Sequence, residues 1–147
     1  MKNIYLDVCT LCHPFDNQSI MRIRLETDAF YLILRGIQNG DYQMIVSPVH
    51  HAEIDDIEVF YERMELKALL EKYGKKKSFQ LKEVQRRAEE LYTLKFGVAD
   101  AVHVAFAEKS SDYFITCDDK LLKKYRKMNF SLSVMDPVEF CVKEDLK

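Results

Sequence analysis

The chain has 147 residues, of which 48% are hydrophobic and 12% aromatic, with only four glycines and three prolines. A chain of this length is expected to form one domain over residues 1–147, because folding it would bury about two-thirds of its unfolded surface. The formal net charge of −2 gives no sign of the strongly basic balance that dedicated nucleic-acid-binding domains usually have. Any attraction to nucleic acid must therefore be local or come from a metal ion.

Hydropathy and the number of cysteines indicate in which cellular compartment the protein is expected. No apolar run approaches the ~18 residues that a membrane span needs, so we expect a soluble, cytoplasmic protein without a membrane partner. Cys9, Cys12, Cys117 and Cys141 are then expected to stay reduced. A zinc or redox role for the C-x-x-C pair formed by Cys9 and Cys12 is the less favoured interpretation, because no second pair completes a zinc site. Three histidines keep the zinc interpretation open: His13, His50 and His51.

The first part of the chain predicts two strands, each leading to a helix. Residues 2–7 are a short apolar run that ends in an acid, which predicts a buried strand. Apolar residues then recur with a period near 3.6 from about residue 19 to residue 38, which predicts a long amphipathic helix. A second strand is expected over 42–47, and Ser47 and Pro48 are typical of a helix N-cap and first helical position.

Helices dominate the middle of the chain. The helical pattern runs from residue 48 to about residue 73, with one break near Ile57. Gly74 and the three lysines that follow it predict a turn. A further helix is expected over about 78–95.

The last third of the chain alternates helices and strands. The apolar stretch VADAVHVAFA at 98–107 predicts a buried helix. Strands are expected at 113–116 and 131–135 with a short helix over 118–127 between them, and Pro137 is expected to open a last helix. Short apolar strands separated by helices imply right-handed crossovers and a parallel sheet covered on both faces. The expected fold class is α/β, with a parallel sheet of about four to five strands.

Four acids are expected to meet at one edge of this sheet, where the carboxyl ends of the strands form binding sites. Asp7 ends the first strand, and Glu53 lies in the second turn of the helix after the second strand. Asp118 follows the 113–116 strand, and Asp100 begins the apolar helix. The sequence therefore predicts an acidic site at this edge.

Each acid also has an ordinary structural interpretation. Aspartate is a preferred N-cap, which favours capping for Asp118 and Asp119 taken singly, and more strongly for Asp136 before a proline. Capping explains Glu53 poorly, because a capping box would need the acid at position 50. Converging carboxylates repel each other unless a divalent cation neutralises them, and hard oxygen ligands favour Mg²⁺ or Mn²⁺. Such an ion suits the hydrolysis of phosphodiester bonds.

The segments that contain these acids resemble the PIN-domain nucleases in order, spacing and local context, over about residues 2–142. They are IYLD with Asp7, SPVHHAEI with Glu53, DAVHVAFA with Asp100 and FITCDD with Asp118. The resemblance implies a three-layer α/β/α domain with an acidic pocket that binds Mg²⁺ or Mn²⁺ and hydrolyses RNA. It assigns the catalytic and metal-binding positions to Asp7, Glu53, Asp100 and Asp118, with Asp119 as a further candidate ligand.

Supporting residues and partners follow from the same resemblance. Thr116 matches the small hydroxyl residue that often precedes the last acid. Relatives often have Asn or a small hydroxyl residue where this chain has Cys9, so Thr10 is the candidate for that supporting role. The HPFDNQ loop resembles R-P-F-D-D-Q of one PIN subgroup, with His13 and Asn17 replacing two charged residues. Many relatives are dimeric toxins of type II toxin-antitoxin modules, which implies an RNA substrate, an antitoxin protein partner and a homodimer.

Two alternatives to a nuclease and one further residue complete the sequence-based expectations. DVCTL resembles the start of haloacid-dehalogenase-type phosphatases, but Cys9 replaces the general acid and the chain is short for that fold. The other alternative is a catalytically weak or inactive PIN-like module that binds a protein.

His103 lies one turn from Asp100, yet on so apolar a helix it is expected to be packed and hydrogen-bonded rather than to transfer protons.

Overall fold

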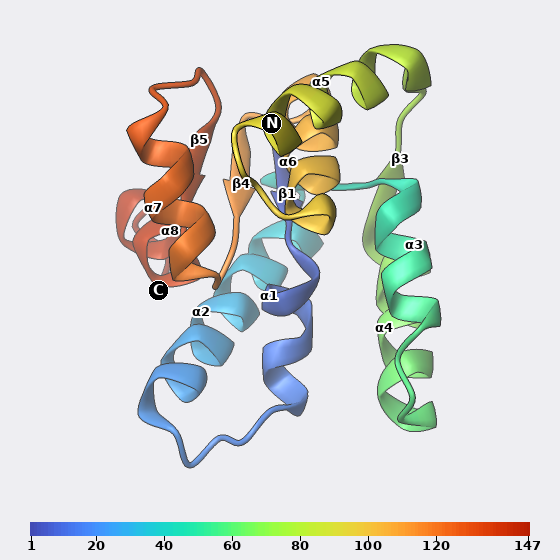
Figure 1. Ribbon diagram of the computed structural model, residues 1–147. Helices are drawn as coiled ribbons and strands as arrows, with labels where there is room; N and C mark the ends of the chain where they lie inside the picture. Colours follow the sequence, from blue (N-terminus) through green and yellow to red (C-terminus); the bar gives the residue numbers. More distant parts are fainter.

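Five parallel strands form one sheet in the computed structural model, which describes residues 1–147 (Figure 1). The strand order is β3-β2-β1-β4-β5, with β1 at the centre. The strands are β1 (Lys2–Leu6), β2 (Tyr42–Val46), β3 (Gly74–Lys76), β4 (Tyr113–Ile115) and β5 (Ser133–Met135). All neighbouring strands pair in parallel, as the alternation of strands and helices predicts.

Eight α-helices pack around the strands, and the 3₁₀ turn η1 (His13–Phe15) follows the first of them. The helices are α1 (Val8–Cys12), α2 (Met21–Gln38), α3 (Pro48–Asp55), α4 (Phe60–Tyr73), α5 (Leu81–Thr93), α6 (Val98–Ser110), α7 (Asp119–Lys127) and α8 (Pro137–Lys143). None of them combines the length and the apolar character that crossing a bilayer would require. The break expected near Ile57 lies between α3 and α4.

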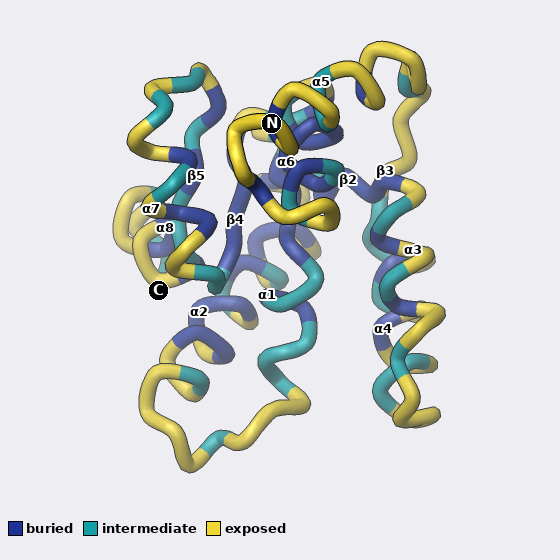
Figure 2. The backbone as a smooth tube through the Cα atoms, viewed as in Figure 1, coloured by how far each residue is buried: buried dark blue, intermediate teal, exposed yellow.

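The sheet has a hydrophobic core on each face, because successive strand residues point to opposite sides. Ile4, Met44 and Ile115 pack into the core that α2, α4 and α8 cover. Tyr5 and Phe114 pack on the other face, against α5, α6 and α7. The central strands are accordingly buried while the outward helix turns are exposed (Figure 2). The molecule is therefore the three-layer α/β/α structure that the sequence predicts.

The expectation of a turn at Gly74 and the lysines after it is wrong. Gly74–Lys76 instead forms β3 and pairs with Met44–Val46 of β2. Both lysines of β3 are exposed at the edge of the sheet, where charged side chains discourage pairing with another chain. A polar edge strand has no apolar alternation, so local pattern does not reveal it.

Candidate metal and catalytic site

The predicted acids lie at the point where the order of the strands reverses. The chain proceeds from β1 to β2 and β3 on one side, and β4 and β5 lie on the other side of β1. In open α/β sheets, ligands bind in the crevice at the carboxyl ends of the strands that flank such a point. The ends of β1 and β4 are followed here by Asp7 and Thr116, respectively.

Asp7 is held rigidly at this crevice. Its backbone N–H donates to the carbonyl of Ile115 at 2.9 Å, which extends the pairing of β1 with β4. Oδ1 accepts a hydrogen bond from the backbone N–H of Val8 at 2.8 Å and caps α1. Oδ2 accepts from the Thr116 hydroxyl, also at 2.8 Å. The carboxylate orientation is therefore set by both strands.

The Thr116 side chain links two of the acids, whereas the Thr10 side chain hydrogen-bonds to neither. The Thr116 hydroxyl donates to Asp7 and accepts from the backbone N–H of Asp118 at 3.1 Å. The buried Thr10 hydroxyl donates instead to the carbonyl of Ile115 at 3.4 Å. The structure thus places Thr116 directly behind the acids and Thr10 against the sheet backbone.

Asp100 is the acid whose environment is most perturbed. It lies at the start of α6, half-buried, where burial raises the pKa of its carboxyl to about 6. The negative charges of Asp7 and Asp118 add to this rise in the pKa, as does that of Glu53 to a smaller extent. The four predicted acids are therefore close enough to repel one another, and a cation would relieve that repulsion.

Asp118 and Asp119 have different surroundings. Asp118 Oδ1 accepts from the backbone N–H groups of Lys120 and Leu121 at 3.0 and 3.2 Å, so Asp118 caps α7 as expected for an aspartate in this position. Its second oxygen is not used by the cap. Asp119 is exposed and both of its carboxylate oxygens pair with the guanidinium of Arg22, which lowers the pKa of the carboxyl.

Glu53 is oriented by a histidine. The Glu53 carboxylate accepts a hydrogen bond from His103 Nε2, and the same nitrogen lies 3.9 Å from Asp7 Oδ1. Only 2% of the His103 side chain is exposed, which confirms the expectation that it is packed and hydrogen-bonded. The sequence-based expectation did not include its partner: His103 joins the carboxylates of Glu53 and Asp7.

A buried chain of hydroxyl and imidazole groups continues behind His103. Tyr5 Oη lies 2.7 Å from His103 Nδ1 and 2.7 Å from Ser47 Oγ. Because a carboxylate accepts the Nε2 proton, Nδ1 of the neutral ring accepts from the Tyr5 hydroxyl. Ser47 can in turn donate to Tyr5. Burial raises the pKa of Tyr5 well above its usual value, so the hydroxyl stays protonated as this arrangement requires.

His50 completes this buried layer at the start of α3. Its Nδ1 accepts from the backbone N–H of Ser47 at 3.1 Å, so Nε2 carries the proton and donates to the carbonyl of Leu6 at 2.7 Å. Burial lowers the pKa of His50 to about 3 and keeps the ring neutral. A capping box usually has an acidic side chain at this position to accept a hydrogen bond from the N-cap backbone. Here the His50 imidazole accepts that hydrogen bond from Ser47.

Sequence reasoning could have found Tyr5 but did not. Tyr5 precedes Asp7 by two residues, so both side chains point to the same face of the sheet. His103 follows Asp100 by three residues, so these two share a helix face. Because α6 packs on the sheet face that Tyr5 occupies, these two spacings indicate that Tyr5 and His103 lie near the acids.

The four acids fit a hydrated divalent ion better than a closed cage of protein ligands. No three of their carboxylate oxygens lie within 4.8 Å of one another. Mg²⁺ usually keeps several waters and binds proteins through one or two carboxylates, and it leaves positions for phosphate oxygens. The donor set, oxygen alone, also agrees with Mg²⁺ or Mn²⁺.

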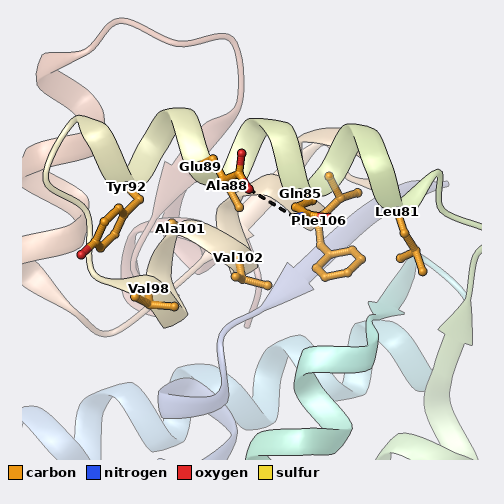
Figure 3. A pocket seen from close by; sticks show the side chains of 10 residues that line it. Leu81, Gln85, Ala88, Glu89, Tyr92, Val98, Ala101, Val102 and Phe106 are labelled. Carbon is orange, nitrogen blue, oxygen red and sulfur yellow. Dashed lines mark hydrogen bonds between the residues drawn. The ribbon is translucent and has the colours of Figure 1, made fainter.

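A separate apolar groove lies between α5 and α6 and includes none of the four acids (Figure 3). Its cavity volume is about 380 Å³. Tyr92 and Val98 lie at one end of the groove and Leu81 at the other, and all three side chains are largely exposed. This groove is a surface feature distinct from the acidic crevice.

The α/β/α sandwich with its five-stranded parallel sheet confirms the predicted α/β fold class. The structure is similar to the crystal structure of FitAcB from Neisseria gonorrhoeae, with a TM-score of 0.53 over 91% of this chain and 97% of that chain. The two sequences are 14% identical, so the likeness concerns the fold alone. No protein-family model matches the sequence, and none of the curated proteins is significantly similar to it.

Proposed function

We propose that this protein is a metal-dependent endoribonuclease, which hydrolyses RNA phosphodiester bonds at the acidic crevice. The observation that supports the proposal is the crowding of carboxylates around Asp100, whose pKa is raised to about 6. Uncompensated repulsion of this kind is costly for folding and is typical of sites arranged for function. In this proposal Asp7, Glu53, Asp100 and Asp118 hold Mg²⁺ or Mn²⁺.

The chain's own residues would position the reacting groups. When bound, the ion would supply an activated water and neutralise charge that develops on the phosphate. Thr116 keeps the Asp7 carboxylate pointed into the crevice, and His103 keeps Glu53 in place. Asp100 is carried by the well-packed helix α6, whose next turns are buried. Such rigid support keeps ligand oxygens in position without a reorganisation cost during the reaction.

The resemblance to PIN-domain nucleases supports a more specific proposal. The protein would be the cytoplasmic toxin of a type II toxin-antitoxin module, act as a homodimer and be inhibited by an antitoxin protein at the acidic crevice. The fold shared with FitAcB is compatible with this proposal. Co-expression with the product of an adjacent small open reading frame tests it: a stable complex with suppressed RNA cleavage is expected.

The nuclease activity is tested with purified protein and mixed RNA in Mg²⁺ or Mn²⁺. Cleavage should stop in EDTA and fall by about 100-fold or more in Asp100→Asn, because a charged ligand oxygen is lost. Asp41→Asn is the matched control, since Asp41 is exposed and lies outside the crevice. Equal cleavage by wild type and Asp100→Asn would refute the metal-site proposal. A phosphatase would instead hydrolyse a small phosphomonoester and leave RNA intact.

The alternative function is a catalytically inactive PIN-like module that binds a protein. The apolar groove between α5 and α6 favours it, because exposed apolar surface of this kind often marks a protein interaction site. The same assay separates the two functions. The absence of both RNA cleavage and Mn²⁺ binding in the wild type would favour the binding module.

A further inference from the structure

We propose that His13, Glu26 and Cys117 form a second metal site, which binds Zn²⁺ and is separate from the acidic crevice. The three residues come from η1, from α2 and from the loop after β4. Their ligand atoms, one from each side chain, all lie within 4.8 Å of one another. The proposal does not depend on the nuclease function.

His13 presents a lone pair to this cluster. Its Nδ1 lies 3.0 Å from Asp16 Oδ2, and a carboxylate can only accept, so Nδ1 carries the proton of the neutral ring. Nε2 is then free of a proton and lies 3.8 Å from Glu26 Oε1. A carboxylate that fixes the far nitrogen of a histidine is the usual outer partner of a zinc-binding histidine.

Glu26 is a buried carboxylate, and one of its two oxygens has no hydrogen-bond partner. Its side chain is 5% exposed, and Oε1 accepts from Arg22 Nε at 2.9 Å. Oε2 is fully buried and has no hydrogen-bond partner. An unpaired carboxylate oxygen away from water is costly, so this atom points to a missing electropositive partner. A metal ion bound to Oε2 would supply it while Arg22 keeps Oε1.

The spacing of His13 and Glu26 is wider than that of a hydrogen-bonded pair, and Cys117 Sγ lies 3.5 Å from Thr10 Oγ1. The 3.8 Å between His13 Nε2 and Glu26 Oε1 is too long for a hydrogen bond. Two ligands at zinc bond lengths lie about 3.3 Å apart in tetrahedral geometry. The His13 and Glu26 side chains would therefore have to move closer together when the ion binds, and His13 lies on a short 3₁₀ turn.

The Cys117 thiol determines which metal ion the proposed site would favour. Imidazole, carboxylate and thiolate together favour Zn²⁺ over Mg²⁺, which prefers oxygen ligands. All four cysteines are free, so this thiol is available. The fourth tetrahedral position is left to water.

Bound Zn²⁺ would connect parts of the chain that are about 100 residues apart. It would tie the His13–Phe15 turn to α2 and to the loop that contains Cys117. Because these ligands come together only in the folded chain, bound Zn²⁺ should raise the melting temperature of the full-length protein.

The test uses the full chain, reduced and freed of metal with EDTA. Zn²⁺ affinity is measured by competition with a chromophoric chelator, and Co²⁺ is used as a spectroscopic substitute. We expect one tight site with a cobalt–thiolate charge-transfer band. Cys117→Ser should abolish the band, and His13→Asn should weaken Zn²⁺ binding by at least about 100-fold, more than loss of an outer partner usually costs.

Matched variants separate this site from the acidic crevice and from non-specific binding. Cys12→Ser and His51→Asn remove a thiol and an imidazole outside the cluster and should leave the band and the affinity unchanged. Asp100→Asn should also leave both unchanged, because Asp100 belongs to the crevice. His13 lies on a partly exposed turn, so its variant is expected to fold, which circular dichroism checks. Absence of tight Zn²⁺ binding in the wild type, or a thiolate band that persists in Cys117→Ser, would overturn the proposal.

Discussion

The Tyr5 hydroxyl connects the hydrophobic core to the acids through His103. It lies between Ser47 and His103, and His103 in turn holds Glu53. Tyr5 lies on β1, Ser47 is the N-cap of α3 and His103 lies within α6, so the hydroxyl links β1 to both helices. Removing it leaves His103 Nδ1 without a partner and takes from Ser47 Oγ the closer of its two contacts.

Tyr5→Phe should therefore lower the free energy of unfolding by about 1–3 kcal/mol, the cost of unsatisfied buried polar groups. Urea denaturation followed by circular dichroism measures it. Tyr31→Phe is the matched control, because the Tyr31 side chain is exposed and its loss of a hydroxyl should be nearly neutral. Equal effects of the two substitutions would show that the Tyr5 hydroxyl has no structural role.

The Asp100 carboxyl makes the stability of the metal-free protein depend on pH. Its folded-state pKa of about 6 exceeds the value of about 3.9 expected in the unfolded chain. The folded state therefore binds more protons between these two values, so the free energy of unfolding falls as the pH rises through this window. The destabilisation caused by the charged Asp100 carboxylate is complete above about pH 6. It vanishes below about pH 3.9, the pKa expected in the unfolded chain.

Asp100→Asn should remove this destabilisation. In EDTA at about pH 7.5 the variant should be more stable than wild type by about 1 kcal/mol, or about 2–4 °C in Tm, a value reduced because the half-buried carboxylate keeps solvent contact. The difference should shrink at about pH 5, where the wild-type carboxyl is largely protonated when folded. A variant less stable than wild type at the higher pH would contradict the repulsion described above. Thermal unfolding at both pH values measures it.

At the scale of elements, the edge strand β3 depends on a close backbone approach. A Cβ at Gly74 would lie 2.4 Å from the carbonyl oxygen of Leu70 and 2.4 Å from Val46 Cγ2. The glycine thus lets the chain leave α4 and pair at once with β2. No apolar pattern accompanies this strand, which is why a turn is the natural expectation from the sequence.

Gly74→Ala should destabilise the protein by about 1–3 kcal/mol, since the methyl group displaces backbone and a packed side chain. Gly97→Ala is the matched control, because a Cβ at Gly97 meets only Asp100 Oδ2, at 3.7 Å. Denaturant unfolding of both variants gives the comparison. A loss of stability no larger in Gly74→Ala than in Gly97→Ala would mean that the edge strand tolerates displacement.

At the scale of the whole molecule, the parallel order of the strands brings the four acids to one edge. β1 and β4 are neighbours although more than 100 residues separate Asp7 from Asp118. The resulting repulsion should make divalent ions stabilising, because an ion that binds only the folded state shifts the unfolding equilibrium.

Mn²⁺ at about 100 times its dissociation constant should raise the free energy of unfolding of the wild type by about 2.7 kcal/mol. The double variant Glu53→Gln, Asp100→Asn should show little of this gain, because two of the four proposed ligands have lost their charge. Thermal unfolding with and without Mn²⁺ gives both values. Equal stabilisation of the two proteins would place any Mn²⁺ outside the crevice.

The sequence by itself determined the order of the main elements, the parallel sheet and the position of four acids near strand ends. Periodicity, caps and apolar runs are local signals, and the carboxyl ends of parallel strands share one edge. It also predicted that His103 is buried and hydrogen-bonded. The metal role of the acids is a prediction from that same pattern.

Only the tertiary structure decided which side chains meet. The pairing of β3, the contact of His103 with Glu53, the ion pair of Asp119 with Arg22 and the cluster of His13, Glu26 and Cys117 all join distant segments. Local patterns do not encode such contacts, because they depend on how the helices pack across the sheet. The physical reason is that side-chain partners are chosen by packing geometry, whereas helices and strands are chosen largely by the sequence within them.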